Sequence, residues 1–188
     1  MEKDAKNPEL MPLESTSCES SIKTFKKDII DYLQKLESLN SKLNPIMIDN
    51  QPEINWMMRP YIIDFLVELH RFFKLNEETL FLACFIADKY CSKRIVYKKH
   101  YQLLIATSLW IAAKFKDKKT RIPTLKELCL LCHQLYDSKI FLQMEKHILT
   151  TLEWTIGNLV STFDMFQVIL STSSEKSIPK HPQLSGLA

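Results

Sequence analysis

The sequence predicts an all-α protein, with a bundle of five helices around a central apolar third helix and one further helix before the bundle. Three observations lead there. Only two glycines, Gly157 and Gly186, occur in 188 residues, against a usual share of about 7%. Tight hairpins and phosphate-cradling loops are therefore few. Apolar residues recur at helical spacing in successive stretches, and the hydrophobic content of 46% is enough to fill a core.

The first part of the chain divides into a tail, a helix and a connection. Residues 1–20 are polar and carry two prolines, so we expect them to be disordered. Residues 22–43 show a narrow apolar stripe that predicts one amphipathic helix. Pro45 and Pro52 then favour an extended connection.

The first two helices of the bundle follow from apolar spacing and caps. A broad stripe from Met58 to Phe73 predicts a helix with Pro60 in its first turn, where a missing N–H matters least. Asn76 is predicted to cap the next helix, residues 77–91, whose first acidic residues suit the helix dipole.

The last three helices complete the bundle. Residues 101–115 form the most apolar stretch, so this helix is predicted to be central. Thr124 with Glu127 predicts a capping box for a short helix ending at Cys132. Asp137 is predicted to cap a long helix over residues 138–152. Residues 158–170 resemble the start of another helix, and residues 171–188 read as a flexible tail.

Composition excludes several classes of function. A net charge of +3 is too small to argue for nucleic acid. Cys129 and Cys132 have the spacing of half a zinc site, but no second pair follows, so no metal is expected. Four of the five cysteines lie among apolar neighbours and are interpreted as small buried apolar residues in a reducing compartment, namely Cys84, Cys91, Cys129 and Cys132. No nucleophile, acid–base pair or glycine-rich loop indicates catalysis, and no cofactor is predicted.

The same sequence bears on localisation. The N-terminus has no apolar signal-peptide region, and the run from Leu103 to Ala113 is too short to span a bilayer. We therefore expect the chain in the nucleus and the cytoplasm, without a membrane partner.

Two charges lie where charge is costly. Lys114 ends the most apolar stretch of the chain, and Glu145 lies within another apolar helical pattern. Such groups are usually paired or turned toward a partner. On spacing alone, an ion pair at helix ends with no partner is the favoured interpretation.

Four stretches of the chain resemble the cyclin family. QPEINWMMRPYIIDFLVEL (51–69) resembles the entry to the first cyclin-box helix, and FLACFIADKYCSKRIV (81–96) the second helix. YQLLIATSLWIAAKF (101–115) and FLQMEKHILTTLEW (141–154) resemble the third and fifth. The resemblance covers residues 22–169 and is nearest to fungal G1 cyclins. It implies an N-terminal helix plus cyclin box over residues 21–157, and residues 158–170 resemble the start of a second box.

The resemblance implies a regulatory subunit that binds and activates a cyclin-dependent serine/threonine kinase and promotes the G1/S transition. Lys114 and Glu145 match the family residues that meet the movable C-helix of the kinase. The matching apolar kinase contacts are Ile111, Phe115, Leu149 and Ile156, with Ile29 and Tyr32 on the N-terminal helix. Arg59 and Asp88 match a structural ion pair.

A substrate-docking patch is a further implication of the resemblance. Its matching residues are Met58, Tyr61, Ile62, Phe65 and Gln102. Ordinary core packing of Met58, Ile62 and Phe65 is the alternative, and Pro60 departs from the family pattern. Other functions left open are a cyclin-fold transcription or adaptor module and a single-box nutrient-signalling cyclin. The kinase, its substrates, the timing of expression and the control by degradation or phosphorylation do not follow from the sequence.

Overall fold

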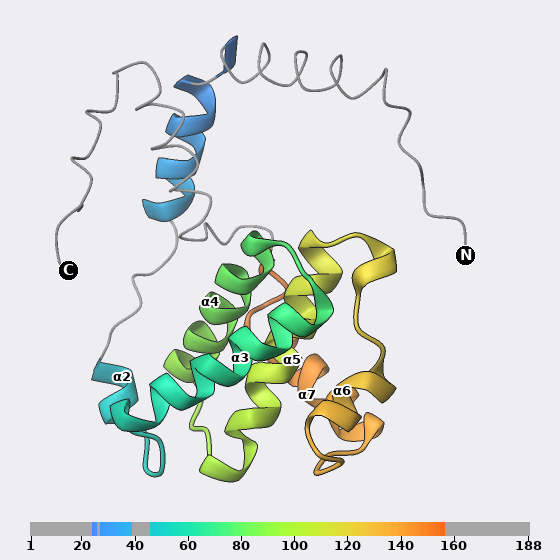
Figure 1. The fold of residues 1–188 in the computed structure, drawn as a ribbon. Helices are drawn as coiled ribbons and strands as arrows, with labels where there is room; N and C mark the ends of the chain where they lie inside the picture. Colours follow the sequence, from blue (N-terminus) through green and yellow to red (C-terminus); the bar gives the residue numbers. More distant parts are fainter. Residues whose placement is uncertain (1–23, 26, 39–45, 157–188) are drawn as a thin grey trace, which may run out of the picture. The chain divides into compact units, whose positions relative to one another are not determined.

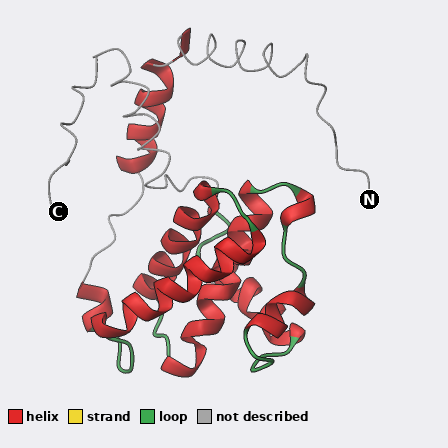
Figure 2. Cartoon of the chain, in the orientation of Figure 1, coloured by secondary structure: helices red, strands yellow, loops and turns green. Residues whose placement is uncertain are grey.

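The computed structural model describes residues 24–25, 27–38 and 46–156. The chain forms two units, residues 1–39 and 40–188. Every regular element among the described residues is a helix (Figure 2), which confirms the all-α prediction. The predictions for residues 1–20, 158–170 and 171–188 lie outside the described residues.

The first unit contains one helix among its described residues. Residues 24–25 and 27–38 are helical, within the 22–43 predicted, and both predicted ends lie outside the described residues. Phe25 and Ile29 of its predicted stripe are exposed by 55% and 40%, and Tyr32 is exposed by 58%.

The connection between Pro45 and Pro52 differs from the extended segment that was predicted. It contains α2 (Ile46–Asp49), a single helical turn that contacts α4. Trp56, at the start of the 3₁₀ helix η1 (Trp56–Met58), donates a hydrogen bond of 2.8 Å from Nε1 to Asp49 Oδ1. This hydrogen bond joins residues seven apart in the sequence and helps to hold the turn.

α3 (Arg59–Phe73) confirms the first predicted bundle helix. Pro60 lies in its first turn, and its inner face buries Leu66 and Leu69. The helix ends at Lys74, whose left-handed backbone (φ 51°) lets its N–H return to the carbonyls of the last turn.

α4 (Glu77–Lys93) begins at Asn76 as predicted, but the Asn76 side chain makes no capping hydrogen bond to the helix. Its Oδ1 instead accepts from Arg121 Nη1 at 3.2 Å. The carboxylate of Asp117 accepts from the Asn76 N–H at 3.1 Å and from the Thr79 hydroxyl. The start of α4 is therefore held by a residue from the end of another helix.

α5 (Lys98–Lys116) is the centre of the bundle (Figure 1), as predicted, and is slightly longer than the 101–115 expected. Every residue from Leu103 to Ala113 is buried. The helix contacts α3, α4 and α7, which explains why it is apolar on all sides.

The remaining elements follow α5. The 3₁₀ helix η2 (Lys119–Arg121) leads to α6 (Leu125–Leu131), which has the predicted capping box of Thr124 and Glu127. α7 (Ser138–Thr151) packs against α5 and α6 and buries Phe141 and Ile148. Asp137 occupies its N-cap position as predicted, but it makes no side-chain capping hydrogen bond.

Candidate functional site: an ion pair between α5 and α7

Lys114 lies in the last turn of α5, one turn after Trp110. Its Nζ sits 3.2 Å from the centroid of the Trp110 ring. Trp110 is itself buried and fixed, because its Nε1 donates to the carbonyl of Pro123 at 2.9 Å. A cation over an indole face is attracted by the ring quadrupole, so the ammonium is held at the edge of the core.

Glu145 meets this lysine from the middle of α7. Lys114 Nζ donates to Glu145 Oε1 at 2.7 Å, and the side chains are 36% and 17% exposed. The two groups come from stretches 31 residues apart, so only the packing of α5 against α7 brings them together. An ammonium has three N–H groups, and a pair at a partly open surface can extend its hydrogen bonds to an incoming backbone.

The apolar residues predicted around this pair divide into two groups. Phe115 is 52% exposed and Leu149 is half-buried, so both have surface to offer a partner. Ile111 and Ile156 are only 4% and 6% exposed and belong to the core. Both side chains therefore pack beneath the surface that carries Lys114 and Glu145 and do not form part of it.

One residue of this surface was not predicted from the sequence. Leu142 is 48% exposed and precedes Glu145 by three positions on α7. Leu142, Glu145 and Leu149 therefore share one face of the helix. The spacing was visible in the sequence, but which face of α7 stays uncovered depends on the packing of the bundle.

Ile29 and Tyr32 belong to the N-terminal unit. Both side chains are exposed, and their spacing of three places them on one face of their helix. That they share a binding surface with Lys114 stays a prediction.

Arg59 and Asp88 join α3 to α4. Two hydrogen bonds of 2.5 and 2.8 Å connect the guanidinium to both carboxylate oxygens. The side chains are 29% and 27% exposed, and donating to the Asp88 carboxylate raises the pKa of Arg59 above its usual value. A bidentate pair of this kind fixes the register of two helices and offers little to a ligand.

All five residues of the predicted docking patch line one groove of about 490 Å³. We call it the docking groove. It adds two residues that the sequence did not indicate, Lys98 and Tyr101. Tyr101 is a buried residue in the wall of the groove, and burial raises the pKa of its hydroxyl to about 12. Tyr61 is 78% exposed at the rim, whereas Met58, Ile62 and Phe65 also pack against the core. That the docking groove binds a substrate stays a prediction.

The structure also bears on the cysteines and on membrane contact. Cys91 and Cys132 are buried, and burial raises their pKa values to about 12 and about 11. No group of three or more potential metal-ligating side chains gathers within the described residues. Of the helices described, none has the length and apolar character needed to cross a bilayer.

Comparison with known proteins agrees with this geometry. The family described as "Cyclin, N-terminal domain" matches residues 28–157. The chain therefore belongs to the cyclin family.

Among the relatives with curated names are several fungal cyclins. The chain is 54% identical over 152 residues to the G1/S-specific cyclin CCN1 of Candida albicans, covering 81% of this chain and 22% of that protein. It is 44% identical to cyclin puc1 of Schizosaccharomyces pombe, covering 71% and 37%. It is 39% identical to the G1/S-specific cyclin CLN3 of Saccharomyces cerevisiae, covering 86% and 28%. The chain thus spans well under half the length of these relatives.

A solved structure shares the fold. The viral cyclin of herpesvirus saimiri matches with a TM-score of 0.62 and 22% sequence identity, over 79% of this chain and 63% of that one. The arrangement of α3 to α7 around α5 is therefore a cyclin box.

Proposed function

We propose that the chain binds and activates a cyclin-dependent kinase and promotes passage from G1 into S phase. Its relatives CCN1 and CLN3 are named G1/S-specific cyclins. The observation that carries the proposal is the Lys114–Glu145 pair, seated on Trp110 at a partly exposed surface.

The chemistry of this surface suits a helical partner segment. Lys114 has further N–H groups to donate to backbone carbonyls, and Glu145 can accept backbone N–H groups. Phe115 follows Lys114 directly, and Leu142 and Leu149 lie on the Glu145 face of α7, so exposed or half-buried apolar area accompanies the pair. Burying that area excludes water, and water exclusion strengthens the polar contacts.

Activation then follows from a shift in conformation. A cyclin that binds the active arrangement of the kinase C-helix better than the inactive one raises the population of the active kinase. The lysine–glutamate pair of the kinase must be in place for phosphoryl transfer. ATP, magnesium and the chemical step belong to the kinase, and this chain acts as its regulatory subunit.

Two further proposals accompany this function. The docking groove holds substrate peptides near the kinase, and its lining by Tyr61, Ile62 and Phe65 supports an apolar anchor. The chain acts in the nucleus and the cytoplasm, where its kinase partner and a reducing medium for its free cysteines are both found.

The test is a kinase assay with purified components. A cyclin-dependent kinase is mixed with the wild-type chain, with the double variant Lys114→Ala/Glu145→Ala, or with Lys116→Ala/Glu78→Ala. The last variant removes a comparable ion pair, 3.1 Å long and 26% and 37% exposed. We expect activation by the wild type and by the control variant, and its loss in the first variant. No activation by any chain, or equal activation by all three, would reject the proposal.

A further inference from the structure

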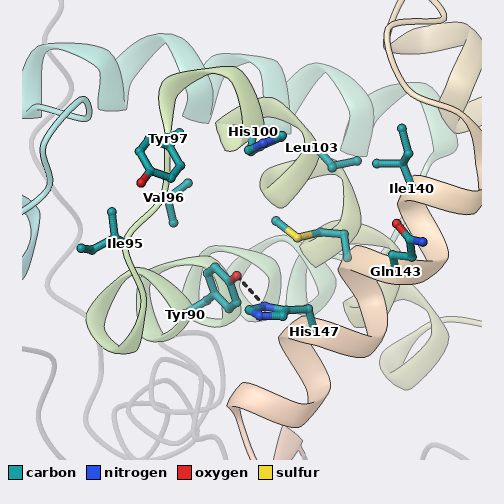
Figure 3. Close-up of a pocket in the computed structure, with 10 residues that line it drawn as sticks. Tyr90, Ile95, Val96, Tyr97, His100, Leu103, Ile140, Gln143 and His147 are labelled. Carbon is teal, nitrogen blue, oxygen red and sulfur yellow. Dashed lines mark hydrogen bonds between the residues drawn. The ribbon is translucent and has the colours of Figure 1, made fainter.

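A second pocket lies beside the first turns of α5, at the end of α4 and against α7. It has a volume of about 320 Å³, and Figure 3 shows the side chains that line it. On its floor the Tyr90 hydroxyl and His147 Nδ1 are 2.7 Å apart in a hydrogen bond. Ile95 and Tyr97 lie on one side, and Ile140 lies across from them on α7. We call this hollow the α5–α7 pocket.

The rim of the α5–α7 pocket is apolar and open to solvent. Ile95 is 63% exposed, Tyr97 50% and Ile140 37%. Three large apolar side chains around one concave site are costly to leave in water, and such clusters mark binding sites. The pocket suits a single apolar side chain of a ligand.

A third hollow connects this pocket to the docking groove. It shares Tyr97 with the α5–α7 pocket, and it shares Lys98 and Gln102 with the docking groove. Successive residues of a helix point about 100° apart, so Gln102, Lys99 and His100 follow one another around α5. The three hollows therefore run as one path around the start of this helix.

The walls of this path are fixed before any ligand arrives. The Gln51 amide donates to the carbonyls of Cys91 and Arg94, both at 2.9 Å, and accepts from the Val96 N–H at 2.8 Å. The carboxylate of Glu53 accepts from the first N–H of α5 at 2.9 Å. A preorganised loop loses little entropy on binding.

The path is also positively charged. Lys98 and Lys99 line it and are both exposed, and the exposed Arg94 lies four residues before Lys98. Glu53, the acidic residue on the path, is engaged in capping α5. Complementary charge steers association and selects acidic partners.

We propose that the three hollows form one groove, which binds an extended acidic peptide of a partner protein through two apolar side chains. One side chain enters the docking groove, and the other enters the α5–α7 pocket. Acidic residues between them lie against Lys98 and Lys99. This inference rests on one part of the function proposed above, namely that the docking groove binds a peptide of a partner protein.

The geometry sets the spacing of the two anchors. A helix with side chains is about 10–12 Å wide, so a path half-way around it is roughly 16–19 Å long. An extended chain advances about 3.3 Å per residue. The two apolar side chains should thus be about five to six residues apart.

The test measures peptide binding to the purified full chain by fluorescence anisotropy. The probe is a synthetic fluorescein-labelled peptide with two leucines about six positions apart and aspartates between them. A second peptide has serine in place of one leucine. We expect Ile95→Ser to weaken the two-leucine peptide about tenfold. The control Leu130→Ser, at a residue equally exposed (63%) and outside the groove, should leave binding unchanged.

Charge variants test the middle of the groove. Lys99→Glu should weaken the two-leucine peptide about tenfold, and Lys126→Glu on α6 should not. The one-leucine peptide should bind the wild type about tenfold more weakly than the two-leucine peptide does, and Ile95→Ser should not weaken it further.

The outcomes separate this proposal from the function proposed above. If Tyr61→Ser weakens the two-leucine peptide but Ile95→Ser does not, the second anchor is wrong and the docking groove stands alone. If no peptide binds, the groove is rejected whatever the kinase assay shows. If peptide binding depends on Ile95 while the kinase stays inactive, the groove stands and the kinase proposal falls.

Discussion

Replacing Lys114 by alanine separates what the ion pair contributes to the fold from what it contributes to a complex. In the free chain, a pair with a 36% exposed lysine contributes under about 1 kcal/mol. The contact of Nζ with the Trp110 ring adds about 0.5–1 kcal/mol. Lys114→Ala should therefore lower the free energy of unfolding by about 1–2 kcal/mol.

Glu145→Ala removes the ion pair but leaves the lysine on Trp110. Its cost to the free chain should stay under about 1 kcal/mol. For a domain of this size, 1 kcal/mol corresponds to a shift in melting temperature of about 2–4 °C. Both variants should thus remain folded, which makes a loss of binding interpretable.

The complex should respond much more strongly. If a kinase covers the pair, each truncation leaves the other charge buried and costs about 2–5 kcal/mol. This equals a loss of affinity of about 30-fold to several thousandfold. The assay is isothermal titration calorimetry with the kinase, beside urea denaturation of the free chain. An affinity loss under about fivefold for Lys114→Ala would show that the pair is only structural.

The remaining predictions concern the fold and its titration. Asp88→Ala should lower the free energy of unfolding by about 2 kcal/mol, measured in urea, because it leaves the half-buried Arg59 without its bidentate partner. Thr124→Ala should cost about 1 kcal/mol by removing a capping box, seen as a lower melting temperature. Hydrogen bonds from the hydroxyl and N–H of Thr124 lower the pKa of Glu127, so its stabilisation is present above the unfolded pKa and is lost as pH falls through the folded one. Glu127→Gln should therefore flatten the acid side of a plot of stability against pH. Cys91, with a pKa raised to about 12, should react with a thiol reagent only as fast as the chain unfolds.

The apolar pattern was sufficient to predict the helices of the bundle. A helix with one apolar stripe buries one face, whereas a helix that is apolar on all sides must be buried on all sides. The continuous apolar run before Lys114 therefore predicts a central helix. Pro60 marks the start of α3, and Thr124 with Glu127 marks the start of α6, because these signals act over three or four residues.

Features that depend on distant contacts were not predicted. Asn76 is a residue type that commonly caps helices, but its side-chain oxygen accepts from Arg121, and its backbone N–H donates to Asp117. The exposure of Leu142 and the burial of Ile111 are decided by which faces of α7 and α5 the neighbouring helices cover. The sequence pattern predicts an apolar stripe on a helix, but it does not predict which neighbouring helix covers that stripe.

The carboxylate of Asp117 fastens the last turn of α5 to the first turn of α4, three residues beyond Lys114. If heating breaks the contact of Asp117 with α4, Lys114 would lose its position before the bundle unfolds. Temperature-sensitive alleles would then be found at Thr79 or Asp117, whose side chains make this contact, and a partner need never touch either residue.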